Sequence, residues 1–120
     1  MGSIKAVVHR EGSSKANGTS LQDYMKITYR ELVEAFGEPL GPSADDKVAA
    51  EWHVSLYDGY ANWTGPESGF VTIYNYKDGK NYLGANGLNI EDITDWHIGG
   101  KALAHVHLLE EYLGQKLVSK

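Results

Sequence analysis

Residues 69–76 read Gly69-Phe70-Val71-Thr72-Ile73-Tyr74-Asn75-Tyr76, a run in which β-branched and aromatic residues dominate. Such residues suit the half-buried surface of a sheet, so the run predicts a β-strand. Lys77-Asp78-Gly79-Lys80 follows, and Asp-Gly is a common turn pair between antiparallel strands. We therefore expect a hairpin here, with Asn81–Leu83 as the returning strand.

A second strand is predicted over residues 50–57. Large apolar residues at positions 52, 54 and 56 alternate there with polar residues at 51, 53 and 55. This period of two is typical of a strand with one face in the core. Shorter strands are expected at Ile4–Val8, at a sheet edge, and at Ile93–Ile98. The Gly- and Ser-rich residues 11–23 predict a loop.

Two helices are predicted, one before and one after the central strands in the sequence. Thr28 and Glu31 match a capping box at the start of a helix over Tyr29–Phe36. The second helix, Lys101–Leu113, follows Gly99-Gly100 and carries an apolar stripe. The stripe consists of Ala102, Val106, Leu109 and Leu113.

These elements predict an α+β fold. Hairpin-sized connections favour an antiparallel sheet, with a short helix from the N-terminal half and the C-terminal helix packed on one face. We expect residues 1–24 to form an N-terminal arm that is flexible in part, and residues 25–120 to form a single domain.

The composition narrows the possible functions of the chain. Its 120 residues contain no cysteine, which excludes disulfides, thiolate zinc sites and a cysteine nucleophile. The net charge of −5 argues against general binding to nucleic-acid backbone. No apolar run has the length of a signal-peptide core or a membrane-spanning helix. The paired acids and the five histidines lack a catalytic or metal-ligand spacing, so we expect no enzyme, no metal and no cofactor.

The double glycine at 99–100 suggests an anion site. If it joins a strand to a helix, the unpaired amides of the first helical turn favour a phosphate, and Lys101 adds positive charge. The same pair also occurs in ordinary tight turns, and no Walker motif is present.

Tyrosines near the predicted hairpin suggest a stacking surface. Tyr74, Tyr76 and Tyr82 flank the lysines at 77 and 80, and Trp96 follows soon after. An aromatic platform beside cations suits nucleobases, which offer a flat face. The alternative is that these tyrosines simply suit strands and interfaces.

Two blocks carry a resemblance to a known family. Residues 73–79, Ile73-Tyr74-Asn75-Tyr76-Lys77-Asp78-Gly79, and residues 91–100, ending in Trp96-His97-Ile98-Gly99-Gly100, precede a terminal helix. The arrangement, over roughly Met25 to Leu113, resembles small bacteriophage proteins, and among them the first type of anti-Thoeris proteins. Those proteins sequester the cyclic ADP-ribose signal of a bacterial defence system.

The resemblance implies a small α+β protein that forms a dimer or higher oligomer, with ligand pockets between subunits. It implies sequestration of a cyclic nucleotide without cleavage, in the cytoplasm of the infected host. Tyr82, Asn89 and Asp95 would take the roles of the aromatic and polar groups around adenine. The chain departs from the family in its arginines, because only Arg10 and Arg30 are present and neither lies on the last helix.

The sequence patterns and the resemblance together predict one set of ligand-binding residues, and two alternative functions remain open. The candidate ligand-binding residues are Tyr74, Tyr76, Tyr82, Asn89, Asp95, Trp96, His97, Gly99, Gly100 and Lys101. The first alternative is a protein that binds and inhibits a host defence nuclease, as an anti-CRISPR or anti-restriction protein does. The second is an enzyme such as a nucleotide hydrolase.

Overall fold

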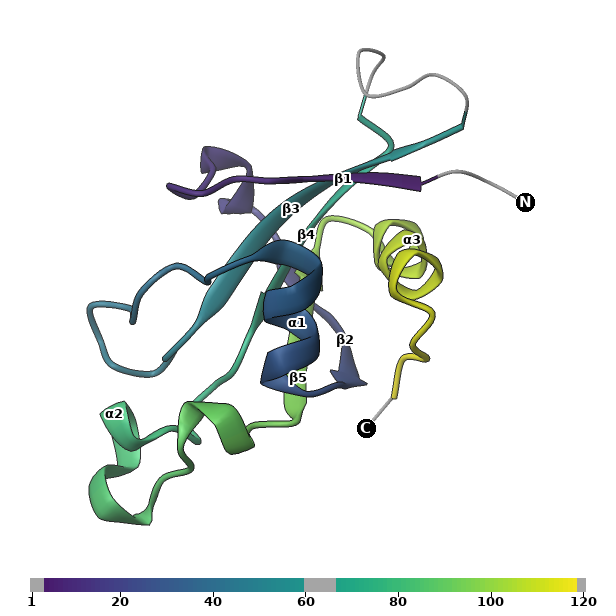
Figure 1. The fold of residues 1–120 in the computed structure, drawn as a ribbon. Helices are drawn as coiled ribbons and strands as arrows, with labels where there is room; N and C mark the ends of the chain where they lie inside the picture. The colour runs from purple at the N-terminus through teal and green to yellow at the C-terminus, as the bar shows by residue number, and fades with distance from the viewer. Residues whose placement is uncertain (1–3, 60–66, 119–120) are drawn as a thin grey trace.

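A five-stranded antiparallel sheet forms the centre of the molecule, in the order β1-β3-β4-β5-β2. The computed structural model describes residues 4–59 and 67–118. Helices α1 and α3 pack on one face of the sheet (Figure 1), as the α+β prediction requires. The strands are β1 (Ile4–Val8), β2 (Ser20–Lys26), β3 (Glu51–Asp58), β4 (Gly69–Tyr74) and β5 (Asp95–Gly100). The helices are α1 (Tyr29–Phe36), α2 (Lys80–Leu83) and α3 (Leu103–Leu113), with short 3-10 turns at Ser14–Ala16, Gly84–Asn86 and Ile90–Asp92.

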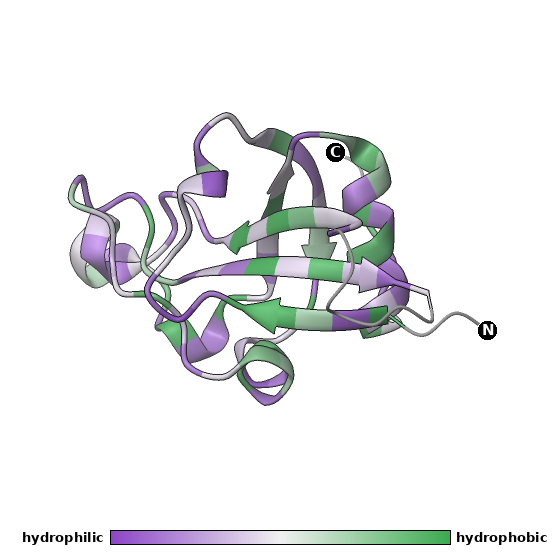
Figure 2. Ribbon diagram, turned by 90° about the horizontal axis from the view of Figure 1, so that it is seen from above, coloured by the Kyte–Doolittle hydropathy of each residue, from purple (hydrophilic) through white to green (hydrophobic). Residues whose placement is uncertain are grey.

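The hydrophobic core lies between the sheet and the two longer helices. Alternate residues of each strand point into it, and Figure 2 shows this as bands of hydrophobic and hydrophilic colour along the strands. Trp52 of β3 and Trp96 of β5 meet at its centre, with ring centroids 5.5 Å apart. Val106 and Leu109 of the predicted apolar stripe on α3 are fully buried in the same core. No helix of the described segments is long and apolar enough to span a membrane.

The start and end of α1 agree with the predicted signals. The Thr28 hydroxyl accepts a hydrogen bond from the Glu31 amide at 3.0 Å, and the Glu31 carboxylate accepts one from the Thr28 amide at 3.1 Å. The capping box is therefore confirmed. Gly37 ends the helix with a φ of 84°, a value that a glycine adopts without steric cost.

The N-terminal residues belong to the sheet, so the prediction of an arm over residues 1–24 is wrong for the described positions 4–24. β1 lies at one edge, as predicted, and pairs with β3. β2 lies at the opposite edge and pairs with β5, with a register shift between Leu21 and Asp23. The prediction of a loop over residues 11–23 missed β2, because its polar residues have low strand propensity and pairing with β5 decides the conformation.

The connection from β1 to β2 crosses the second face of the sheet, opposite α1 and α3. The two strands are at opposite edges, so residues 9–19 must span four strand spacings, roughly 19 Å. Along this path the Ser13 amide donates to His53 Nδ1 at 3.0 Å, and Lys15 forms an ion pair with Glu67 at 2.8 Å. The centre of the second face is therefore covered, whereas its end near Tyr74 and His97 is only half-buried.

The hairpin predicted after β4 does not form. Lys77 has a left-handed φ of 62°, and its amide donates to Lys47 O at 2.7 Å. The chain then enters the short helix α2, so the predicted returning strand over residues 81–83 is wrong. The Leu88 amide donates to Asp78 O at 2.8 Å, which closes this segment as a loop of its own rather than as an extension of the sheet.

Candidate functional site

A row of aromatic side chains runs across three strands on the second face. The register pairs Tyr24 of β2 with His97 of β5, and His97 with Tyr74 of β4. Directly paired residues of adjacent strands point to the same face. His97 therefore lies between two tyrosines that are distant from it in the sequence.

A third tyrosine completes this group, which we call the His97 cluster: Tyr24, Tyr74, Tyr76 and His97. The Tyr24 ring meets His97 edge-on, with centroids 4.9 Å apart and an interplanar angle of 76°. The Tyr74 and Tyr76 rings are tilted towards His97 at 5.3 and 5.7 Å. Such tilted and edge-to-face contacts are favourable for aromatic rings and hold the four side chains as one surface.

Lys77 and Tyr82 extend the His97 cluster at its rim. The Lys77 ammonium lies 5.2 Å from the ring centre of Tyr76 and 5.8 Å from that of Tyr82. Both tyrosines are well exposed, at 41% and 43%. The surface therefore offers accessible aromatic rings next to a positive charge.

The surroundings of Tyr74 keep its hydroxyl group neutral. Burial raises the pKa of Tyr74, and the nearby carboxylate of Glu51 raises it further. Tyr74 is therefore a protonated hydroxyl at neutral pH, able to donate a hydrogen bond. The His97 cluster can therefore offer stacking and hydrogen bonding to a ligand.

Three predicted site residues are not available to a ligand at this surface. Trp96 and Gly100 point to the helix face, where Trp96 is fully buried and its Nε1 donates to Ile27 O at 3.0 Å. Gly99 is also buried, and a Cβ there would lie 2.5 Å from the Thr72 hydroxyl. The glycines end β5 instead of opening a helix, because α3 begins only at Leu103. The predicted anion site at a helix start is therefore wrong.

The other predicted residues are spread along the molecule. Asp95 lies on the same face as His97, one row further on, and forms an ion pair with Lys26 at 3.0 Å. Lys101 follows the opposite end of β5, roughly 20 Å away along the strand. Asn89 precedes a 3-10 turn and donates to Asp92 at 3.3 Å. Of the predicted set, Tyr74, Tyr76 and His97 come together, and Tyr82 joins them through Lys77.

Tyr24 is the cluster residue that the sequence analysis missed. It lies in β2, a segment predicted as a loop up to residue 23, and no local pattern links it to His97. Only the pairing of β2 with β5 places the two rings in contact. Lys77 was noted as a nearby cation, but its position over two rings depends on the left-handed backbone at that residue.

A groove at the end of α1 is a weaker candidate for an anionic ligand. It has a volume of about 570 Å³ and is lined by Tyr29, Arg30, Val33, Glu38 and Glu91. Arg30 forms an ion pair with Glu34 at 3.5 Å, which leaves the carboxylates of the groove in excess. A phosphate would be repelled there.

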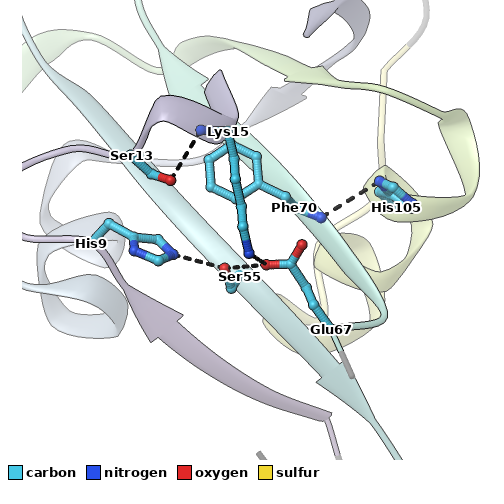
Figure 3. A network of polar contacts seen from close by, with 7 residues as sticks. All are labelled: His9, Ser13, Lys15, Ser55, Glu67, Phe70 and His105. Atoms are coloured by element: carbon cyan, nitrogen blue, oxygen red, sulfur yellow. Dashed lines mark hydrogen bonds and ion pairs between the residues drawn. The ribbon is translucent and has the colours of Figure 1, made fainter. Parts of the chain in front are cut away.

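A polar network lies beside the crossing connection on the second face (Figure 3). Ser55 donates to Glu67, which also accepts from Lys15 at 2.8 Å. His9 Nε2 lies 2.7 Å from Ser55 Oγ, whose own proton is engaged with Glu67, so His9 is the donor in this contact. Burial alone would raise the pKa of Glu67, but the hydrogen bonds from Lys15 and Ser55 outweigh it and lower the pKa.

The geometry of this network differs from that of a catalytic triad. In a catalytic triad the histidine takes the proton of the serine, and the carboxylate orients the histidine. Here the carboxylate binds the serine directly, and Ser55 is only 1% exposed. The network joins β1, β3 and the crossing connection, and Phe70 adds a weak contact from its amide to His105 Nδ1 of α3 at 3.5 Å (Figure 3).

We expect acid to destabilise the fold through His9. Burial lowers its pKa from the ordinary 6.5, and the Lys15 charge lowers it further against the opposing effect of Glu67. The unfolded chain therefore takes up a proton at a higher pH than the folded one, so stability present above pH 6.5 is lost as the pH falls through the pKa of His9. The loss of melting temperature between pH 7.5 and 5.5 is expected to be smaller in His9→Gln.

The matched control for this prediction is His107→Gln, because His107 lies on an exposed part of α3. Thermal unfolding of the three proteins at both pH values is the measurement. An unchanged loss in His9→Gln would show that His9 does not govern the acid response.

The described residues form no cluster suited to a metal ion, and no similar protein was found. Within residues 4–59 and 67–118, no group of three histidine or acidic side chains is placed to hold a metal ion. Comparison of the chain with protein families, with curated proteins and with solved structures finds no match.

Proposed function

We propose that this protein binds a nucleotide through the His97 cluster and sequesters it without chemical conversion. The observation that carries the proposal is the contact of Tyr24, Tyr74 and Tyr76 with His97 on a half-buried sheet face. Aromatic side chains on a sheet are a common platform for nucleobases, since every base offers a flat π-face. The hydroxyl of Tyr74 supplies a hydrogen-bonding group for the base edge.

The class of nucleotide comes from the resemblance to anti-Thoeris proteins. We therefore propose cyclic ADP-ribose and related cyclic nucleotides as the first ligands to test, and the cytoplasm of a phage-infected bacterium as the place of action. Sequestration requires binding alone, so no catalytic group is needed. We also propose a homo-oligomer, in which a second copy would enclose a ligand that lies on an exposed surface.

Native mass spectrometry of the purified protein with a panel of cyclic nucleotides tests the proposal. The expected result is a complex whose added mass is that of the intact ligand and stays constant with time. Stacking of a base on an aromatic side chain contributes about 1–3 kcal/mol. Tyr76→Ala is therefore expected to weaken binding roughly tenfold to a hundredfold.

The matched control is Tyr112→Ala. Tyr112 has a similar exposure, 37%, but stacks on Phe36 on the helix face. Its replacement is expected to leave ligand affinity unchanged. A fall in ligand mass with time would identify an enzyme, and equal affinity of the two variants would place the site elsewhere.

A second candidate is a protein that binds and inhibits a host defence nuclease. It is favoured by the segment around α2, where Tyr82, Leu83 and Leu88 are exposed at 43%, 44% and 45%. Figure 1 shows this segment projecting from the end of the sheet. Exposed tyrosine and apolar side chains are typical of protein interfaces. An unliganded protein across the nucleotide panel, together with inhibition of DNA cleavage by such a nuclease, would favour this candidate.

A further inference from the structure

Lys77, unlike Lys26 and Lys47, has no carboxylate partner within the described part of the chain. Lys26 pairs with Asp95 at 3.0 Å, and Lys47 lies 3.8 Å from Asp45. Within residues 4–59 and 67–118, no acidic side chain lies within ion-pair distance of the Lys77 ammonium, which instead lies over the Tyr76 and Tyr82 rings. In a chain with a net charge of −5, this leaves a positive charge at the rim of an aromatic surface.

The backbone holds Lys77 in this position at a conformational cost. Its φ of 62° lies in the left-handed region, which a non-glycine residue enters at a cost of about 1–2 kcal/mol. The hydrogen bond from its amide to Lys47 O, at 2.7 Å, fixes this conformation. Next to it, the buried Asn75 binds both the Ala49 and Ala50 amides and Asp78. A strained residue that its surroundings fix in this way is a common feature of ligand sites.

The cation is close enough to serve a ligand that stacks on the rings. Tyr76 lies close to both His97, at 5.7 Å, and the Lys77 ammonium, at 5.2 Å. A base on the His97 cluster would therefore have its ribose and phosphate within reach of this lysine. Release of the ammonium from two exposed rings costs little, because each exposed cation–π contact contributes about 0.5–1 kcal/mol.

We propose that Lys77 contacts a phosphate group of the ligand, so that the site selects nucleotides over nucleosides. This inference rests on the proposed function, because it assigns the anionic part of the same site. It places the phosphate at the end of β4, at the opposite end of the sheet from the Gly99-Gly100 position.

Adenosine and 5′-AMP are the probes that test this assignment, since they share the base and differ in the phosphate. Binding of each to the full chain is followed by NMR through the shifts of the tyrosine and histidine ring protons. We expect 5′-AMP to bind about tenfold more tightly than adenosine, the effect of one charge-assisted contact. Lys77→Gln is expected to abolish this preference by weakening 5′-AMP alone, and Lys77→Arg to retain it.

The matched control is Lys80→Gln, which removes the same charge from an exposed neighbour that lies over neither ring. It is expected to leave the preference for 5′-AMP unchanged. Equal weakening of both probes in Lys77→Gln, or no change in either, would overturn the phosphate contact while leaving the base site intact. If the unaltered protein binds neither probe nor any cyclic nucleotide of the panel, the proposed function fails and this inference with it.

Discussion

Trp96→Ala is expected to lower the free energy of unfolding by about 3–5 kcal/mol, the usual effect of truncating a buried tryptophan. Trp96 is fully buried and packs edge-on against Trp52 at 5.5 Å. Its loss would leave a cavity at the centre of the core and would leave Ile27 O without its hydrogen bond from Nε1. Because a domain has a total stability of only about 5–15 kcal/mol, the variant is expected to be partly unfolded at moderate temperature.

Urea denaturation followed by fluorescence and circular dichroism measures this effect. Tyr82→Ala is the control, because it also removes an aromatic ring but from a side chain that is 43% exposed. We expect the control to change the free energy of unfolding by less than about 1 kcal/mol. A stable Trp96→Ala protein with weakened nucleotide binding would instead restore Trp96 to the ligand site.

Asn75→Ala is expected to lower the free energy of unfolding by about 2–4 kcal/mol. The Asn75 side chain is completely buried, and its Oδ1 accepts from the Ala49 and Ala50 amides at 2.7 and 3.1 Å. Its Nδ2 donates to Asp78 at 2.8 Å. Alanine would leave the two amides without an acceptor, and buried donors that lose their partner carry the full desolvation cost.

The Asn75 substitution has a second consequence, because Asn75 anchors the segment that carries Lys77. We expect the Asn75→Ala substitution to accelerate amide hydrogen exchange more in residues 76–88 than in β3 and β4. Asn89→Ala is the control, since Asn89 is exposed and bonds only to Asp92 at 3.3 Å. Equal stability of the two variants would show that the Asn75 hydrogen bonds contribute no net stability.

Local sequence patterns predicted the structure correctly where they alone decide it. Helix α1 has its predicted bounds, because Thr28 and Glu31 form reciprocal hydrogen bonds at its start and Gly37 ends the helix. Strands β3 and β4 were predicted from alternation and from β-branched residues, which reflect burial of one face. The residues of each signal lie within a few positions of each other, so the signal does not depend on contacts with the rest of the chain.

The errors fall where distant contacts override local preference. Asp78-Gly79 is a common hairpin pair, but the buried Asn75 side chain and the left-handed Lys77 direct the chain into α2. The Gly99-Gly100 pair suggested an anion site at a helix start, whereas at Gly99 the Thr72 hydroxyl lies where a side chain would be. In both cases a tertiary neighbour determined the role of the residue.

By itself the sequence determined the α+β class, the capped helix, two central strands and the presence of many tyrosines near cations. Only the tertiary structure decided which side chains come into contact. Tyr24 and His97 lie far apart in the chain and become neighbours because β2 pairs with β5 in one register. A shift of that register by one residue would turn Tyr24 to the opposite face, since strand side chains alternate. Trp96, one residue from His97, lies in the core because successive side chains of a strand point to opposite faces.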